Sequence, residues 1–171
     1  MMNFFLIAVT GYWFAVTTPD GEMHGGGVTD AKTYLTGNHQ IVSHIEKDKA
    51  WQIVRDFNAA GKIIPVDIDH KSCTPGVKFD MNKDAVAVID RLALLDNGAI
   101  AARFIFSPDG LKRYRKGEWG YISPSFHERF FFDTGKSIVL GFHSVAVTNT
   151  PQYKSLRLEH LWKTEIKDRA K

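Results

Sequence analysis

The sequence has little of three features that would place it in a specialised class of protein: cysteine, long apolar runs and charge of one sign. Its single cysteine, Cys73, excludes an internal disulfide, so the fold does not require an oxidising compartment. No uninterrupted apolar run reaches the ~20 residues that a membrane helix needs. The 22 basic and 19 acidic residues are spread along the chain, and a formal charge of +3 is too small to indicate a nucleic-acid-binding surface. We therefore expect a protein that binds neither membrane nor nucleic acid.

The apolar N-terminus is better explained by strands than by a signal peptide. It lacks a basic leading segment, and Gly11 and Tyr12 interrupt the apolar run before the first charge at Asp20. We expect strands over residues 3–9 and 12–17, in a soluble cytoplasmic protein.

At 171 residues, with 44% hydrophobic and 24% charged residues, the chain fits one globular domain with a core of its own. Apolar positions recur at helical spacing over 47–60, and Gly61 follows where a helix cap is expected. A second short helix is expected over 111–116, and a charged, helix-permissive tail covers 153–171. The glycine-rich segment 19–30 is expected to be a loop, and the main strands are expected over 63–70, 86–92, 100–106, 119–132 and 137–147, with a hairpin turn at 96–98.

Two of these strands carry residues that can do chemistry. His70 ends the first, and Ser123 interrupts another 53 positions later. A serine hydroxyl becomes an effective nucleophile when an imidazole takes its proton, and histidine titrates near neutral pH. The pair therefore predicts a nucleophile and a general base. The residues alone also allow a turn serine and a strand-end histidine hydrogen-bonded to a carboxylate.

The residues around His70 do not indicate a metal site. Asp67, Asp69, His70 and Cys73 match no common zinc spacing, and they mix hard and soft ligands. Asp67 lies three positions before His70, which in a regular strand places it on the opposite face and favours a structural role. Cys73 is an alternative nucleophile, but its position as a lone cysteine in a Ser-Cys-Thr-Pro loop favours an incidental role. We expect no metal and no cofactor.

Three segments in this order resemble the Mu-like phage I protein family, the head-maturation proteases of tailed phages. They are IPVDIDH at 64–70, GEWGYISPSF at 117–126 and VAVTNTP at 145–151. The family pattern is a Pro-Val-Asp-x-x-His strand, a Tyr-x-Ser-Pro-x-Phe strand and an apolar strand ending Leu-Thr-Asn-x-Pro. Here Val147 replaces the leucine. The first segment is also similar to the corresponding strand of herpesvirus assemblins.

The resemblance implies a fold and an activity. It covers a core of about 63–151 within a single protease domain over 1–171. It implies a strand-dominated α+β fold, with an assemblin-like β-barrel core flanked by two or three helices. It also implies a serine endopeptidase in which Ser123 is the nucleophile and His70 the base, with Ser125 as the rival nucleophile on the same strand face.

The third catalytic member is expected on the strand after the nucleophile. His143 is the titratable group there, and we expect it to take this role. Counting back from Pro151, however, places Ser144 in register with the family position. Successive strand residues face opposite sides, so His143 requires a bulge, which Gly141 could supply.

The function implied is cleavage of the scaffold protein and the major capsid protein inside the assembling prohead, in the host cytoplasm. Self-processing and a homo-oligomer fit the same expectation, and no cofactor is needed. Two alternatives stay open. One is a non-enzymatic head-assembly protein with the same fold, and the other is a metal-dependent hydrolase that uses the Asp-rich strand ending at His70.

Overall fold

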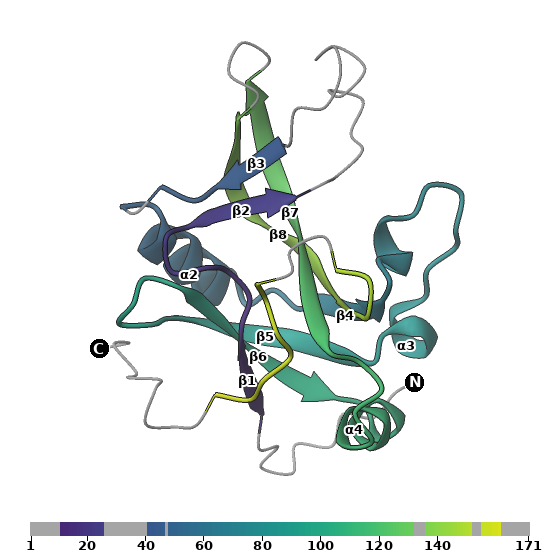
Figure 1. Ribbon diagram of the computed structural model, residues 1–171. Helices are drawn as coiled ribbons and strands as arrows, with labels where there is room; N and C mark the ends of the chain where they lie inside the picture. Colours follow the sequence, from purple (N-terminus) through teal and green to yellow (C-terminus); the bar gives the residue numbers. More distant parts are fainter. Residues whose placement is uncertain (1–10, 26–40, 47, 132–135, 152–154, 162–171) are drawn as a thin grey trace.

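The computed structural model describes residues 11–25, 41–46, 48–131, 136–151 and 155–161. Eight strands form one sheet in the order β1-β6-β5-β4-β8-β3-β2, and β7 pairs with β8 outside this path. The sheet curls into a half-barrel with helices at its sides (Figure 1), which confirms a strand-dominated α+β fold. The elements are β1 (Tyr12–Ala15), β2 (Glu22–Gly25), β3 (Ile41–His44), α2 (Ala50–Ala60), β4 (Ile64–Ile68), a 3₁₀ turn η1 (Lys71–Cys73), α3 (Met81–Asp84), β5 (Ala87–Leu94), β6 (Ile100–Phe106), α4 (Pro108–Arg115), β7 (Tyr121–Phe131) and β8 (Lys136–Thr148).

The long strand β8 connects the parts of the sheet. It pairs with β7 in antiparallel fashion along its whole length. On its other side, β3 pairs in parallel with its first residues, up to Ile138, and β4 pairs in parallel with Val145 to Val147. Residues 139–144 therefore have no strand partner on that side among the described residues.

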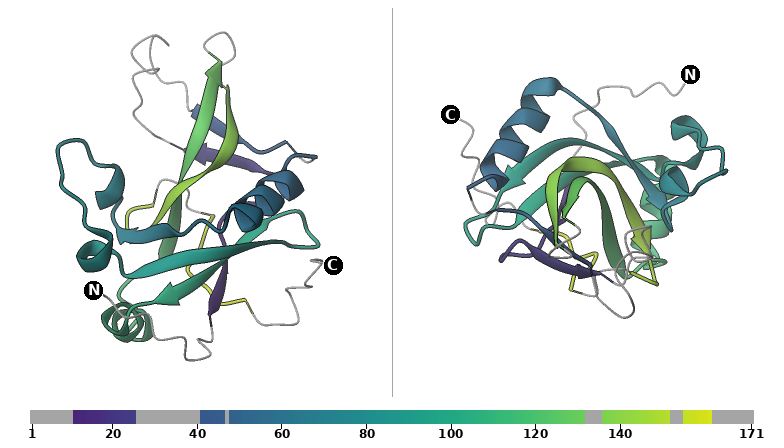
Figure 2. Two further views of the ribbon diagram at one scale, coloured as in Figure 1. Left: turned by 180° about the vertical axis from the view of Figure 1, so that it is seen from behind. Right: turned by 90° about the horizontal axis from the view of Figure 1, so that it is seen from above.

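The segment 155–161 links two strands that the sheet order leaves apart. Leu161 donates its backbone N–H to Trp13 of β1, while Ile122 of β7 donates to Leu156. The views in Figure 2 show this segment, in yellow, running across the open side of the curled sheet. Backbone bonds from one extended segment thus bring β1 and β7 together across the half-barrel.

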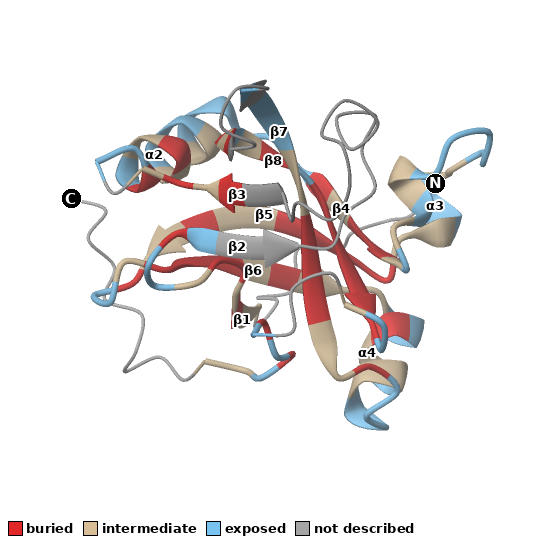
Figure 3. Ribbon diagram, turned by 45° about the horizontal axis from the view of Figure 1, so that its top comes forward, coloured by how far each residue is buried: buried red, intermediate tan, exposed pale blue. Residues whose placement is uncertain are grey.

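The core lies inside the curl and is rich in aromatic and branched side chains. Phe14 and Phe104 are fully buried with ring centroids 4.8 Å apart, and Tyr114 of α4 stacks on Phe106 at 5.1 Å. Figure 3 shows buried residues along β4, β7 and β8, where these strands meet. The buried part of β8 includes residues 144–148, so polar side chains there lie in a water-poor environment.

No helix within the described ranges is long and apolar enough to cross a membrane.

Several sequence-based expectations agree with the structure. Gly61 ends α2 in the left-handed conformation, with φ of 59°. The turn at 96–98 joins β5 and β6, and α4 begins after Ser107, whose hydroxyl accepts a hydrogen bond from Gly110 N–H. Local turn and cap chemistry determined these three features.

Other expectations were wrong. The segment 19–30 was expected to be a loop, yet residues 22–25 form β2, paired with the unexpected strand β3. The tail is not helical over 155–161. The strand expected over 63–70 ends at Ile68, so His70 lies in the turn that follows. The strand expected over 3–9 lies outside the described residues.

Gly110 provides a test of the packing between α4 and the sheet. A Cβ on this glycine would lie 2.0 Å from the carbonyl oxygen of Val86. We expect Gly110→Ala to lower the free energy of unfolding by about 1–3 kcal/mol, measured by urea denaturation, because backbone would have to move. Gly141→Ala is the matched control, since a Cβ there meets nothing within 4 Å. Equal stability of the two variants would contradict this packing.

Candidate active site

The structure brings together the histidine and the serine that the sequence singled out. Nε2 of His70 lies 2.8 Å from Oγ of Ser123. Ser123 is fully buried on β7, and His70 is half-buried in the turn that follows β4. The strand β8 determines this approach, because Ala146 is the register partner of Ser123 on one side and of Asp67 on the other.

Directly after β4, a strained turn directs the chain toward Ser123. Asp69 and His70 both have left-handed backbone conformations, with φ of 52° and 60°. Such conformations cost about 1–3 kcal/mol for residues other than glycine and are concentrated at functional sites. The turn is held by β8, because Asp69 N–H donates to the Val147 carbonyl and Thr148 Oγ1 donates to Asp69 Oδ1 at 2.5 Å.

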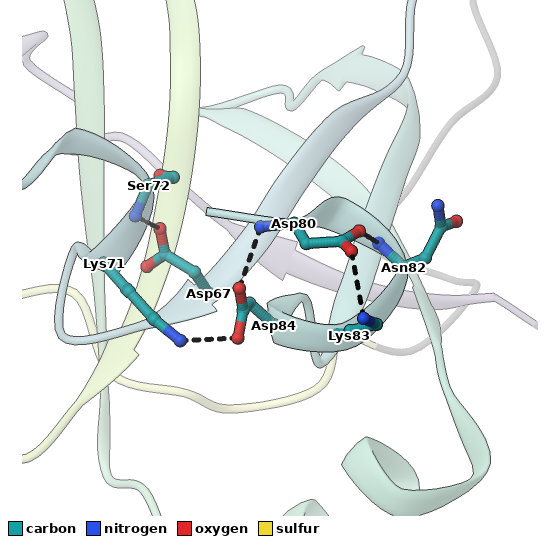
Figure 4. Close-up of polar contacts among 7 residues, drawn as sticks. All are labelled: Asp67, Lys71, Ser72, Asp80, Asn82, Lys83 and Asp84. Carbon is teal, nitrogen blue, oxygen red and sulfur yellow. Dashed lines mark hydrogen bonds and ion pairs between the residues drawn. The ribbon is translucent and has the colours of Figure 1, made fainter. Parts of the chain in front are cut away.

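Carboxylates also hold the loop that follows His70 (Figure 4). Oδ2 of Asp67 accepts a hydrogen bond from Ser72 N–H at 2.7 Å. Lys71 pairs with Asp84 at 2.5 Å, and Asp84 also accepts from the backbone N–H of Asp80. These bonds fasten both ends of the loop 69–84, so the position of His70 does not depend on one contact.

The environment of His70 favours its neutral form. Burial lowers the pKa of this imidazole below its ordinary value of 6.5, while the negative charges of Asp67 and Asp69 oppose the shift. A neutral imidazole has a lone pair that can accept the serine proton. The protonation state therefore suits a general base at neutral pH.

The second serine of the motif has different neighbours. Ser125 lies two residues after Ser123 on β7 and is 3.4 Å from Sγ of Cys73. Cys73 also lies 3.1 Å from Oγ of Ser144 and 3.3 Å from Nδ1 of His143. The described contacts thus join Ser123 to a histidine and Ser125 to the cysteine, a neighbour that sequence reasoning did not anticipate because it depends on how the loop after His70 folds.

His143 lies at a bulge in β8. Ser125 pairs with Ser144 and Phe126 with Phe142, so His143 is the extra residue, and a second shift leaves Leu140 extra. A bulge was expected at Gly141, but Gly141 pairs with His127 and lies between the two bulges. The bulge turns His143 toward Cys73 and Ser144 and brings its ring within 5.3 Å of the His127 ring. The described contacts of His143 do not include His70.

A groove lies beside this part of β8. It has a volume of about 560 Å³ and runs between α2 and the strand, with six consecutive β8 residues, 138–143, along one wall. Ile53 and Phe57 of α2 face them across the groove.

Within the described ranges, no group of three or more His, Cys, Asp or Glu residues is arranged to hold a metal ion.

Comparison with known protein families identifies the family of this chain. Residues 27–158 match the model of the Mu-like prophage I protein, N-terminal domain. The chain belongs to this family. The match extends beyond the 63–151 core expected from the motifs, and it includes His70, Ser123 and His143. Neither the curated proteins nor the solved structures gave a match. The family makes this a phage-related protein.

The pKa of His70 is directly measurable. We expect the NMR signals of its imidazole to titrate below pH 6.5, because burial disfavours the charged ring. The unfolded chain then takes up this proton first as the pH falls, so stability is full above about pH 6.5 and declines toward the folded pKa. Titration of His70 at or above 6.5, assigned by its loss in His70→Gln, would contradict this site.

Proposed function

We propose that this family member is a serine endopeptidase of phage head maturation, with Ser123 as nucleophile and His70 as general base. The observation that carries the proposal is the 2.8 Å contact between Nε2 of His70 and Oγ of Ser123. The family supports the phage context. The proposed substrates are the scaffold protein and the major capsid protein, cleaved within the assembling prohead in the host cytoplasm.

In the proposed reaction, neutral His70 takes the proton of Ser123 as the hydroxyl attacks a peptide carbonyl. The resulting imidazolium then donates this proton to the leaving amine, and water hydrolyses the acyl-enzyme in a second round. Backbone N–H groups are the usual donors to the oxyanion. Pro124, which follows the nucleophile, has no N–H and cannot contribute.

The burial of Ser123 adds a requirement. With no exposed surface, its hydroxyl can meet a peptide carbonyl only if a covering group moves when substrate binds. We expect the His70–Ser123 bond to be retained while the access route opens.

The third member remains a proposal. The resemblance places it on the strand after the nucleophile, where His143 is the titratable group and Ser144 is in register with the family position. The imidazole of His143 contacts Cys73 in this structure. If His143 orients His70, then His143→Ala weakens cleavage more than Ser144→Ala does, and both are milder than His70→Ala.

The choice of Ser123 over Ser125 is tested by covalent labelling. We expect a fluorophosphonate probe to form one adduct on the native chain, located on Ser123 by peptide mass mapping, because this hydroxyl lies 2.8 Å from Nε2 of the proposed base His70. Ser125→Ala should label like the native chain, and Ser123→Ala should not label. The adduct rate should rise with pH through the His70 titration and be unaffected by a chelator.

An adduct on Ser125, or labelling that survives in Ser123→Ala, would show that the nucleophile was chosen wrongly. Loss of labelling on adding a chelator would favour the metal-dependent hydrolase. A native chain that never labels would favour the non-enzymatic head protein.

A further inference from the structure

One buried carboxylate oxygen near the candidate active site has no partner. Asp67 is fully buried, and its Oδ2 accepts the bond from Ser72 N–H, but its Oδ1 has none. Figure 4 shows a single dashed line on this carboxylate. An unpaired buried acceptor costs about 1–3 kcal/mol, and more when it is charged, so its retention calls for an explanation.

The sheet register places Asp67 in line with the nucleophile. Asp67 on β4, Ala146 on β8 and Ser123 on β7 are consecutive register partners, so their side chains project from the same face. The sequence-based expectation that Asp67 faces away from His70 was therefore wrong. It assumed a regular strand through residue 70, whereas the strand ends at Ile68.

The spacing of these three register partners leaves room for a histidine ring between Asp67 and Ser123. Neighbouring strands lie about 4.8 Å apart, which puts the Asp67 and Ser123 backbones about 10 Å apart. Ala146 between them has only a methyl group, and an imidazole hydrogen-bonded at both nitrogens fits this span. The ring of His70 already uses Nε2 for Ser123.

We propose that Asp67 is the positioning residue of this site, with its free Oδ1 accepting a hydrogen bond from Nδ1–H of His70 in the active form. The inference rests on the proposed function. Asp67 would hold the tautomer that leaves Nε2 free to accept the serine proton, and it would stabilise the imidazolium that forms. His143 would then serve the bulge and the adjoining groove rather than His70.

The test compares Asp67→Asn with Asp69→Asn. The asparagine at 67 keeps an oxygen for Ser72 N–H but removes the charge. We expect the fluorophosphonate labelling rate to fall by a factor on the order of 10²–10⁴. The pH midpoint of the remaining rate should move to lower pH, because the Asp67 charge is the larger of the two that raise the pKa of His70.

Asp69→Asn is the matched control. It removes the other carboxylate that acts on His70, but its side chain bonds to Thr148. We expect a rate within about tenfold of native and a smaller shift in midpoint. Thermal melts check that both variants fold. If the native chain labels on Ser123 while Asp67→Asn keeps the native labelling rate and pH midpoint, the role proposed for Asp67 is wrong and the proposed function stands. If the native chain does not label, the role of Asp67 and the proposed function are both wrong.

A second, independent observation concerns the unpaired edge of β8. Residues 139–143 line the groove beside α2, and within the described ranges their outer edge lies between the end of β3 and the start of β4. An open backbone edge in a groove is a template for an added extended peptide. Ile53, Val139 and Phe142 of its lining are buried and apolar. Charged residues line it as well: Glu46, Lys49, Asp56 and Lys62.

The groove lies along the same strand, β8, that pairs with the strand of the proposed nucleophile. His143, at its end, is three residues from Ala146, the register partner of Ser123. At about 3.3 Å per residue this is about 10 Å. We infer that the groove binds the extended peptide substrate and accepts a large apolar side chain about three residues from the scissile bond.

Ala60→Trp tests this binding site, with Ala59→Trp as the matched control. Both alanines are exposed neighbours on α2, but only Ala60 lines the groove. In a mixture of synthetic peptides, the native chain should preferentially cleave those that carry a large apolar residue about three residues from the scissile bond. We expect Ala60→Trp to lose the preference and cut such peptides at least tenfold more slowly.

Ala59→Trp should retain the preference, and both variants should label with the small fluorophosphonate at the native rate. Leu140→Asp, at a groove residue that is 63% exposed, gives a second variant that spares the core. If native labels on Ser123 but cuts without this preference, or if Ala60→Trp keeps it, the groove assignment is wrong and the proposed function is unaffected. A native chain that neither labels nor cuts would refute both.

Discussion

The candidate active site depends on one constraint, the double pairing of β8. Its residues 145–147 lie between β4 and β7, with Ala146 as the common register partner of Asp67 and Ser123. A shift of one residue in either pairing would move Ser123 or Asp67 to the other face of the sheet. The 2.8 Å bond between His70 and Ser123 is therefore a consequence of register. The same strand, three residues earlier, forms a wall of the groove.

The polar groups around this pairing are arranged at a cost in stability. Two successive residues adopt left-handed conformations, a serine is buried, and one buried carboxylate oxygen has no partner. The left-handed conformations and the unpaired oxygen are unfavourable by themselves, whereas the buried Ser123 hydroxyl is compensated by its bond to His70. Together they hold a neutral imidazole against a hydroxyl in a water-poor place, which is the arrangement that proton transfer requires. The loop bonds of Asp67 and Asp84 supply the rigidity that keeps it so.

Features with local causes could be predicted from the sequence, and features that depend on distant pairing could not. Periodicity and Gly61 predicted α2, and the turn at 96–98 predicted the β5–β6 hairpin. The segment 19–30 contains several glycines and therefore indicated a loop. Residues 22–25 form β2 because they pair with β3, and this pairing cannot be read from the local sequence. The position of His143 follows from a bulge that only the pairing of β7 with β8 defines. Motif order pointed to His70 and Ser123, but it did not indicate the orphan oxygen of Asp67.

The most direct test of the proposed His70–Ser123 catalytic pair is the intact mass of the cognate scaffold protein after incubation with this chain. Native protein and Ser123→Ala are compared at neutral pH, since the substitution removes one hydroxyl and adds no volume. If Ser123 is the nucleophile, the native chain gives discrete cleavage products and Ser123→Ala leaves the scaffold mass unchanged. Identical products from both proteins, or an intact scaffold with both, would contradict the claim that the His70–Ser123 pair is the catalytic centre of an endopeptidase.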